Sequence, residues 1–343
     1  MKSYLLCNNR INVDYLSYPI QKSNFMTRPY CILITCLLIC LASFNIYGQR
    51  YSEQIFEEVN KETVRYLNAP DKDLQIDIYQ PANDKKESRP VILYVHGGGF
   101  AGGSRDEPAI IEFCENMARR GIVTVSMSYT LTMKGKSFGC GQAAANKLAT
   151  FKHVALEIAE ATRYIIESKK RLSIDPGAIV LAGSSAGAEA VLHAAYWKET
   201  QTPLPKSFTY GGVISMAGAI YDINLISAES AIPTQLFHGT CDNLVPYGTA
   251  PHHYCNEDAP GYLVLHGAAS IADRLEKLKK GYYLMTGCND GHGWAGRPFK
   301  KHRDEIAEFI WLDVLQSKFR QVHKVIETNK DCTITSTPEA CSN

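Results

Sequence analysis

The chain has 343 residues, of which 45% are hydrophobic and 21% are charged, and its formal net charge at pH 7 is +1. This is the composition of a globular protein that can bury a large core, and neither internal repeats nor low-complexity tracts are evident. The charge is balanced, and no basic stripe is interleaved with aromatic residues. The sequence therefore gives no electrostatic reason to expect nucleic-acid binding.

The first 48 residues form an N-terminal extension with the layout of a secretory signal peptide. Residues 31–44 are apolar and uncharged, Arg28 precedes them, and Gly48 is a small residue at a cleavage point. This apolar region is shorter than the roughly 18 residues that a spanning helix needs. Because the uncharged stretch extends beyond it, an uncleaved membrane anchor remains an alternative. We expect a secreted or periplasmic protein that starts at either Met1 or Met26.

Residues 49–325 are expected to form one domain, followed by a polar tail over residues 326–343. Strands alternate with helices, which indicates βαβ crossovers and a mostly parallel sheet. Strands are predicted at residues 74–79 (exposed on one face), 90–95, 122–127, 179–182, 212–216, 234–238 and 281–285. Helices are predicted at residues 106–120, 150–170, after 186 and at 304–322, with a turn at 174–177 and a loop over the site within 130–149.

A glycine cluster follows the predicted strand at residues 90–95, where His96 precedes Gly97, Gly98 and Gly99. Without a Cβ, backbone N–H groups can approach an anionic oxygen, and one such donor contributes about 3 kcal/mol of transition-state stabilisation. Gly98 and Gly99 are therefore candidate oxyanion-hole donors. A lone run of three glycines also suits a tight turn with positive φ.

The segment around Ser185 has the pattern G-x-S-x-G between an apolar run and a stretch rich in Ala, Val and Leu. A nucleophile at such a strand-to-helix turn sits in strained backbone, and Gly183 and Gly187 leave the room that this needs. Ser185 is therefore the candidate nucleophile, and the N–H of Ala186 points at the oxyanion site. The pentapeptide also occurs in ordinary strand-to-helix turns, so it carries weight only together with other motifs.

An acid and a histidine follow later predicted strands. Asp242 comes just after one strand, where it would hold the tautomer of a catalytic histidine. His292 follows the last predicted strand and would accept the proton of Ser185. Taken singly, Asp242 also suits an Asx-turn, and His292 suits a surface loop.

Other titratable residues are given less weight. Asp290 is a rival acid, but Asp242 is preferred because its position after the preceding strand fits the fold. His238 ends a strand, so a structural role is expected for it rather than that of a second base. A metal site is an alternative for the cluster of His252, His253, Cys255 and Asp258. It is given less weight because the side chains of adjacent histidines often point apart.

The order of serine, acid and histidine, each after a strand, is that of α/β-hydrolases. The chain resembles this superfamily over about residues 70–320. Its His-Gly-Gly-Gly-Phe and Gly-Ser-Ser-Ala-Gly motifs resemble those of hormone-sensitive-lipase-like carboxylesterases and secreted bacterial esterases. The resemblance implies an α/β-hydrolase fold with helices on both faces of a mostly parallel sheet, no large cap domain and no cofactor. It assigns the triad to Ser185, Asp242 and His292, and the oxyanion hole to Gly98, Gly99 and Ala186.

The predicted function is hydrolysis of carboxylic esters through an acyl-enzyme, with a small-molecule or glycan-linked substrate. No large cap insertion is visible, which favours short acyl groups, including acetyl or feruloyl esters on polysaccharide. Residues 130–142 lack the Arg-Leu-Ala-Pro-Glu run common in the similar esterases, so the acyl and alcohol preferences stay open. Phe100 and Trp294 are candidate substrate-binding residues, with Phe138 as a further pocket residue, although Phe100 also suits a packed core.

The same triad would serve an arylformamidase or a peptidase. A non-catalytic binding protein on a hydrolase scaffold is an alternative from a different class. Such proteins typically lose the nucleophile or the histidine, and this chain keeps both Ser185 and His292.

Seven cysteines lie beyond residue 48, and export would allow them to form disulfides. Cys332 and Cys341 are close in the tail and form one candidate pair, and Cys241 and Cys288 form another if their strands are neighbours. The odd number leaves at least one cysteine without a partner in the chain. The absence of a C-x-x-C motif argues against a zinc ribbon or a thioredoxin-type centre. The pairing stays open among Cys114, Cys140, Cys241, Cys255, Cys288, Cys332 and Cys341.

Overall fold

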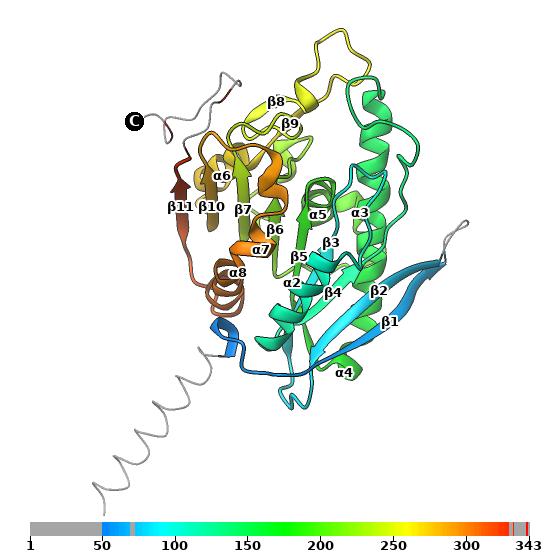
Figure 1. Cartoon of the computed structure of the whole chain (residues 1–343), viewed down its shortest axis with the longest axis vertical. Coiled ribbons are helices and arrows are strands. Elements are labelled where there is room, and N and C mark those ends of the chain that lie inside the picture. The colour runs from blue at the N-terminus through cyan, green and yellow to red at the C-terminus, as the bar shows by residue number, and fades with distance from the viewer. Residues whose placement is uncertain (1–49, 69–72, 329–331, 333–340, 342–343) are drawn as a thin grey trace, which may run out of the picture. The chain divides into compact units, whose positions relative to one another are not determined.

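The computed structural model describes residues 50–68, 73–328, 332 and 341, so the expected signal peptide and most of the expected tail lie outside the described residues (Figure 1). A nine-stranded sheet forms the centre, in the order β1-β2-β4-β3-β5-β6-β7-β10-β11. The β1–β2 and β2–β4 pairs are antiparallel, and all other neighbours in this sheet are parallel. The strands are β1 Val59–Asn68, β2 Asp73–Pro81, β3 Arg89–Val95, β4 Val123–Met127, β5 Ile174–Ser184, β6 Gly212–Met216, β7 Thr234–Gly239, β10 Tyr282–Gly287 and β11 Gln321–Ile326, with a separate antiparallel pair of β8 Thr249–Pro251 and β9 Val264–His266.

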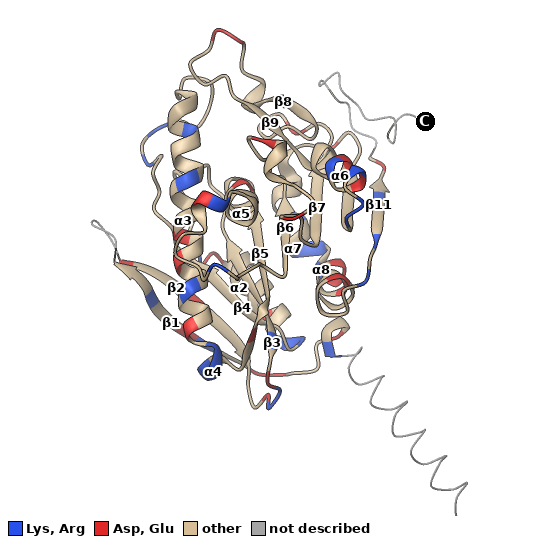
Figure 2. Cartoon of the chain, turned by 180° about the vertical axis from the view of Figure 1, so that it is seen from behind, with Lys and Arg blue, Asp and Glu red and all other residues tan. Residues whose placement is uncertain are grey.

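Helices cover both faces of this sheet (Figures 1 and 2). Successive residues of a strand point to opposite faces, and Val91 and Leu93 of β3 enter one core while Ile92 and Tyr94 enter the other. The first core holds apolar side chains of α3, α5 and α6, and the second holds those of α2, α7 and α8. The helices are α2 Pro108–Arg119, α3 Ala144–Glu167, α4 Lys169–Leu172, α5 Ala186–Tyr196, α6 Ala268–Lys277, α7 Pro298–Lys301 and α8 Arg303–Phe309.

The predicted alternation of strands and helices is confirmed, but the C-terminal helix is shorter than predicted. A π-helical turn, Ile310–Leu315, continues α8, and Ser317 then adopts a left-handed φ of 49°. The chain next forms β11, parallel to β10, where the sequence predicts helix as far as residue 322. The prediction was wrong because the burial pattern of this edge strand is irregular and mostly exposed, so its side chains carry little period-two signal.

Two further predictions are corrected by the sheet. The turn expected at residues 174–177 lies within β5, where the pairing with β3 shifts between Arg89 and Val91. The alternating pattern of β2 predicts one exposed face, yet Asp77 is fully buried there. Lys61 and Arg105 each approach a carboxylate oxygen of Asp77 at 3.0 Å, and these ion pairs compensate its burial.

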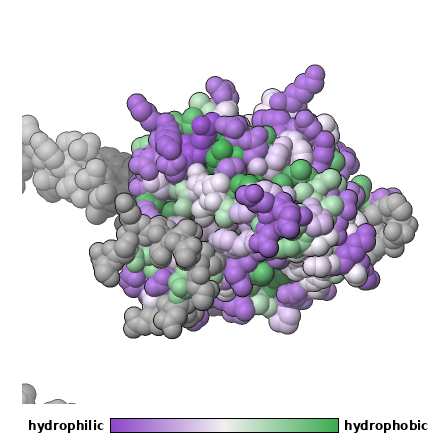
Figure 3. Space-filling view, turned by 90° about the horizontal axis from the view of Figure 1, so that it is seen from above, coloured by the Kyte–Doolittle hydropathy of each residue, from purple (hydrophilic) through white to green (hydrophobic). Residues whose placement is uncertain are grey.

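The charged residues are dispersed over the described chain. Lys and Arg residues and Asp and Glu residues are scattered over the ribbon in Figure 2. Seen from above, the surface is mostly hydrophilic, with hydrophobic side chains scattered between (Figure 3). Within the described ranges, none of the helices combines the length and the hydropathy that a membrane span needs.

His193 of α5 is a neutral histidine in the core. It is fully buried and stacks on Phe151 and Tyr221, with ring centroids 4.4 and 5.6 Å away. Its Nδ1 lies 2.6 Å from the carbonyl oxygen of Glu189, and the backbone N–H of Tyr221 donates to its Nε2 at 3.2 Å. Because a carbonyl only accepts, Nδ1 carries the proton. Burial disfavours the charged imidazolium and lowers the pKa of His193 to about 4.

We predict that His193 makes the fold sensitive to mild acid. Between the ordinary histidine pKa and the lowered one, the unfolded chain binds a proton that the folded chain does not, so stability falls as the pH falls. From pH 7 to pH 5, His193 contributes a loss of about 2 kcal/mol in unfolding free energy. Urea denaturation at both pH values should show a smaller loss for His193→Gln than for the wild type.

The exposed His153 provides the control, because its hydrogen bond to Glu157 raises its pKa. A raised pKa stabilises the fold at low pH, so His153→Gln should enlarge the loss rather than reduce it. An unchanged pH dependence in His193→Gln would contradict the prediction.

Candidate active site

Ser185 occupies a sharp turn between β5 and α5. Its backbone has φ 53° and ψ −123°, a left-handed conformation that few non-glycine residues adopt. Gly183 and Gly187, two residues before and two residues after Ser185, are required because a larger side chain would clash. A Cβ on Gly183 would lie 2.2 Å from the carbonyl oxygen of Gly187, and a Cβ on Gly187 would lie 2.2 Å from that of Val95. The turn therefore packs directly against the end of β3.

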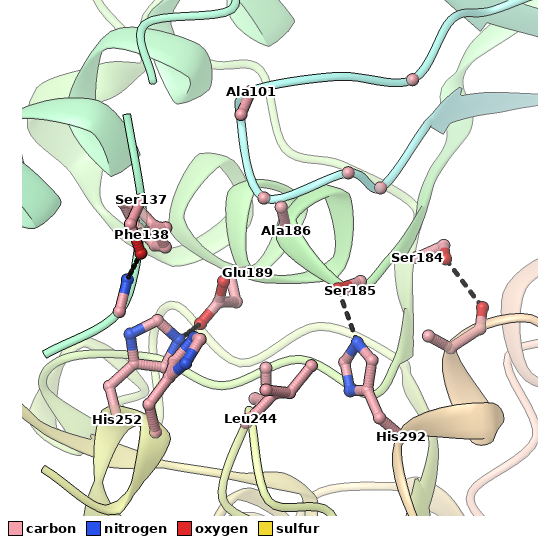
Figure 4. Close-up of a pocket in the computed structure, with 18 of the residues that line it drawn as sticks. Ala101, Ser137, Phe138, Ser184, Ser185, Ala186, Glu189, Leu244, His252 and His292 are labelled. Carbon is pink, nitrogen blue, oxygen red and sulfur yellow. Dashed lines mark hydrogen bonds and ion pairs between the residues drawn. The ribbon is translucent and has the colours of Figure 1, made fainter. Parts of the chain in front are cut away.

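A chain of hydrogen bonds joins Ser185, His292 and Asp242, and Figure 4 shows its first bond, between Ser185 and His292. Ser185 Oγ lies 2.8 Å from His292 Nε2, and His292 Nδ1 lies 2.7 Å from Asp242 Oδ2. The three residues follow β5, β10 and β7, whose parallel pairing brings their carboxyl ends to one edge of the sheet. A carboxylate only accepts, so Nδ1 of His292 donates to Asp242 and Nε2 is left to accept the hydroxyl proton of Ser185.

Asp242 is completely buried and accepts from several donors. The backbone N–H groups of Leu244 and Val245 donate to its Oδ1 at 2.9 and 3.0 Å. Its Oδ2 lies 3.2 Å from Nε2 of His238, which also faces the carbonyl oxygen of Val245 at 3.1 Å. Burial by itself raises the pKa of Asp242, but the hydrogen bonds from His238 and His292 outweigh it and hold the pKa below its ordinary value. Asp242 is therefore a carboxylate at neutral pH.

The rival acid Asp290 contacts other partners. Its Oδ2 accepts from Trp294 Nε1 at 3.2 Å and pairs with Arg297 at 2.7 Å. Its Oδ1 accepts the backbone N–H of Gly291. These bonds hold the loop that carries His292. His238, for which the sequence predicts a structural role, contacts Asp242, which also binds His292.

One cavity of about 650 Å³ opens beside Ser185. Gly97, Gly98 and Gly99 line it together with Ala186, so the glycine cluster and the turn at Ser185 face the same space. Gly98 has a φ of 109°, and a Cβ there would lie 2.3 Å from the carbonyl oxygen of Gly102. Only glycine fits this position without strain.

Of the three aromatic residues expected in the cavity, only Phe138 lines it. Phe100 and Trp294, the candidate substrate-binding residues, are fully buried in the two hydrophobic cores. Phe100 packs against Phe138 and Phe151 at ring distances of 5.0 and 5.8 Å, and Trp294 stacks on His302. Both predictions were wrong, because nearness to a motif in the sequence does not show to which side a ring points.

Sequence reasoning missed Glu189 and Leu244 as lining residues, and it gave His252 and His253 only a metal-binding alternative. For Glu189 a signal existed. It lies four residues after Ser185, which places it on the same helix face, and it is an acid within an otherwise apolar stretch. Within the described residues no group of three or more His, Cys, Asp or Glu side chains could hold a metal ion, and Cys255 is in a disulfide.

The three disulfides among the described residues differ from both candidate pairs. Cys140 pairs with Cys255, Cys241 with Cys332, and Cys288 with Cys341. Closeness in the sequence predicted the wrong pairs, because β11 runs beside β10 and returns the chain to the loop after β10. There the N–H of Cys288 donates to the carbonyl oxygen of Ile326, and two cysteines of the tail reach Cys241 and Cys288. Of the seven cysteines that the structure describes, Cys114 forms no disulfide and is buried.

The sequence model of the BD-FAE family matches residues 76–275, which include the glycine cluster, Ser185 and Asp242. The chain belongs to the BD-FAE family. Among solved structures, native esterase 2 of Thermogutta terrifontis superposes with a TM-score of 0.56 at 20% identity, over 74% of this chain and 92% of that one. The fold of this BD-FAE family member is therefore that of the α/β-hydrolases, as predicted.

Two curated relatives match parts of this BD-FAE family member. Liver carboxylesterase 1F of Rattus norvegicus is 26% identical over 176 residues, which cover 50% of this chain and 29% of that protein. The medium-chain fatty acyl-CoA hydrolase precursor of Anas platyrhynchos is 31% identical over 157 residues, 45% of this chain and 26% of that protein. The chain thus spans less than a third of the length of these relatives.

We predict that the Cys241–Cys332 disulfide stabilises the loop that carries Asp242. The bond closes a segment with a sequence separation of 91 residues. Because a cross-link of this length restricts the unfolded chain, replacing both cysteines by serine should lower the unfolding free energy by about 2–4 kcal/mol. Urea denaturation of the double variant measures this. Cys114→Ser breaks no disulfide and gives the loss of unfolding free energy that a cysteine-to-serine change causes by itself. An equal loss in this variant and in the double variant would contradict the prediction.

Proposed function

We propose that this protein is a serine hydrolase that cleaves carboxylic esters through an acyl-enzyme. The observation that carries the proposal is the continuous hydrogen-bond chain from Ser185 Oγ through His292 to Asp242. Membership of the BD-FAE family and the names of the relatives, a carboxylesterase and an acyl-CoA hydrolase, support it. The same arrangement of residues performs acyl transfer on several unrelated folds.

In the proposed mechanism, Ser185 Oγ attacks the ester carbon while its proton moves to Nε2 of His292. Asp242 holds the imidazole by its Nδ1–H and stabilises the imidazolium that forms. The backbone N–H groups of Gly98, Gly99 and Ala186 bind the oxyanion. The tetrahedral intermediate collapses, and the alcohol leaves with the proton from His292. Water then repeats the sequence on the acyl-enzyme and releases the acid.

For the substrate, we propose an ester with a short acyl group or one linked to carbohydrate. The cavity of about 650 Å³ offers room for a small substrate beside Ser185. Thermogutta terrifontis esterase 2 has been solved with propionate bound and with butyrate bound, and both are short acids. For the compartment we propose export. The apolar N-terminal segment supports this, and so do the three disulfides, since disulfides persist in oxidising compartments.

Variants of Ser185 and Asp242 test the proposed mechanism. We expect a fluorophosphonate probe to label the wild type and not Ser185→Ala, because only the serine hydroxyl can attack phosphorus. Hydrolysis of p-nitrophenyl acetate should fall by about 10⁴-fold in Asp242→Asn, since the amide cannot hold the required histidine tautomer. Equal labelling of the wild type and Ser185→Ala, or none of either, would favour a binding protein on a hydrolase scaffold.

The dependence of turnover on acyl length tests the proposed substrate. Turnover of p-nitrophenyl acetate and butyrate should exceed that of the palmitate ester by at least about 10-fold in kcat/KM, because a long alkyl chain in this cavity would displace water from Glu189, His252 and His253 without replacing its hydrogen bonds. A preference for palmitate would overturn the short-chain proposal. Parallel assays on an N-formyl arylamine and on a peptide p-nitroanilide would detect arylformamidase or peptidase activity, which the same triad could support.

A further inference from the structure

One end of the cavity beside Ser185 is unusually polar for a pocket wall (Figure 4). Glu189, His252 and His253 line it, with Phe138 beside them. Glu189 is placed by α5, where its backbone N–H donates to the carbonyl oxygen of Ser185 at 3.0 Å. It is therefore one helical turn beyond the nucleophile, a rise of roughly 5 Å along the helix axis. A substrate bound at Ser185 therefore needs only a few more atoms to reach Glu189.

Two polar atoms at this end are buried without a hydrogen-bond partner in the part of the chain that the structure describes. Glu189 and His252 are each only 1% exposed. Within the described chain, no group hydrogen-bonds to Oε1 of Glu189 or to Nδ1 of His252. Oε1 lies 3.3 Å from Nε2 of His252, a close contact without hydrogen-bond geometry. A buried polar atom left unpartnered costs about 1–3 kcal/mol, so folding alone gives no reason to keep two of them beside one cavity.

The cluster as a whole is close to electrically neutral. The ammonium group of Lys147 is buried nearby, where it donates to the carbonyl oxygen of Gly261 at 2.9 Å and interacts electrostatically with Glu189. Burial raises the pKa of Glu189 and lowers that of His252, and both shifts favour the uncharged forms. Because burial also lowers the pKa of Lys147, a bound ion would meet no strongly charged partner at this wall. A neutral group that both donates and accepts hydrogen bonds suits this wall best.

The wall is also held rigidly. His253 and Tyr254 have left-handed φ values of 55° and 51°. Such strain costs about 1–3 kcal/mol per residue and is concentrated at functional sites. The Cys140–Cys255 disulfide ties this strained turn to the loop that carries Phe138. The turn is further fixed by backbone hydrogen bonds from His252 to Leu263 and from His253 to Leu244.

We propose that Glu189 and His252 form a subsite that binds a hydroxyl group of the ester substrate, one helical turn from Ser185. A hydroxyl group is both a donor and an acceptor, so it can bond to the carboxyl of Glu189 and to a nitrogen of His252 at once. An alkyl chain at the same place would leave both groups unpartnered. This inference rests on the proposed ester hydrolysis and specifies its substrate further: the ester carries a hydroxyl group on its acyl chain or on its alcohol.

Two matched pairs of esters test the subsite and locate the hydroxyl group. The acyl pair is p-nitrophenyl butyrate and p-nitrophenyl 3-hydroxybutyrate, and the alcohol pair is propyl acetate and glycerol 1-acetate. We expect the wild type to favour the hydroxylated member of one pair by at least about 10-fold in kcat/KM, because a site built for a hydroxyl group discriminates strongly against its absence. The pair that shows the preference tells on which side of the ester the hydroxyl group lies.

The variants Glu189→Leu and His252→Phe should remove that preference, so that the ratio of kcat/KM between the hydroxylated and the plain member of the pair falls to about one. Glu189→Gln keeps a hydrogen-bonding group and should retain part of it. Ile110→Val changes an apolar residue of the same cavity and should affect both members of a pair alike. Thermal unfolding identifies any variant that fails to fold, and the comparison of paired esters on the wild type needs no variant.

The proposal is overturned if the wild type discriminates in neither pair, or if Glu189→Leu and His252→Phe keep the full preference. Hydrolysis of the plain esters without any preference would leave the proposed esterase function standing and reject the subsite alone. If no ester is turned over and Ser185 is not labelled by fluorophosphonate, the proposed function fails, and the subsite fails with it.

Discussion

The close packing of helix α5 against the end of strand β3 is the constraint on which the site depends. Neither Gly183 nor Gly187 has room for a Cβ, because carbonyl oxygens of the turn and of β3 lie in the way. This contact brings Ser185 into the cavity that the glycine cluster after β3 also lines. The left-handed backbone of Ser185 costs about 1–3 kcal/mol. Burial of β5 and α5 offsets it, since every residue of α5 is buried.

A second constraint is the way in which a buried carboxylate is kept charged. Asp242 has no exposed surface, yet its two oxygens face two backbone N–H groups and two imidazoles. These donors compensate the loss of water, so the residue remains a strong acceptor for His292. His238 contributes to this from β7, which links the core of the sheet to the candidate catalytic residues.

The disulfides act at the same edge of the sheet. Cys241 precedes Asp242 directly, and Cys288 lies on the loop that carries His292, and both bond to cysteines of the tail. The third disulfide, Cys140–Cys255, connects the turn that carries His252 and His253 to the loop that carries Phe138. Loops that would otherwise be the most mobile parts of the fold are thus cross-linked where they carry polar side chains. Two of these bonds depend on β11, which brings the tail back beside β10.

Short-range patterns in the sequence were sufficient to predict the class of fold, to single out the glycine cluster and to place Ser185, Asp242 and His292 in order after their strands. Each depends on a local rule, such as an apolar run before a tight turn, and parallel strands then bring their carboxyl ends to one edge. Tertiary structure decided the direction of the side chains and the partners of the cysteines. Phe100 and Trp294 lie beside motifs and point into the cores, while Glu189 and His252 come from distant segments and meet in the cavity. Burial and pairing depend on what the rest of the chain places opposite each residue, and no local pattern contains that information.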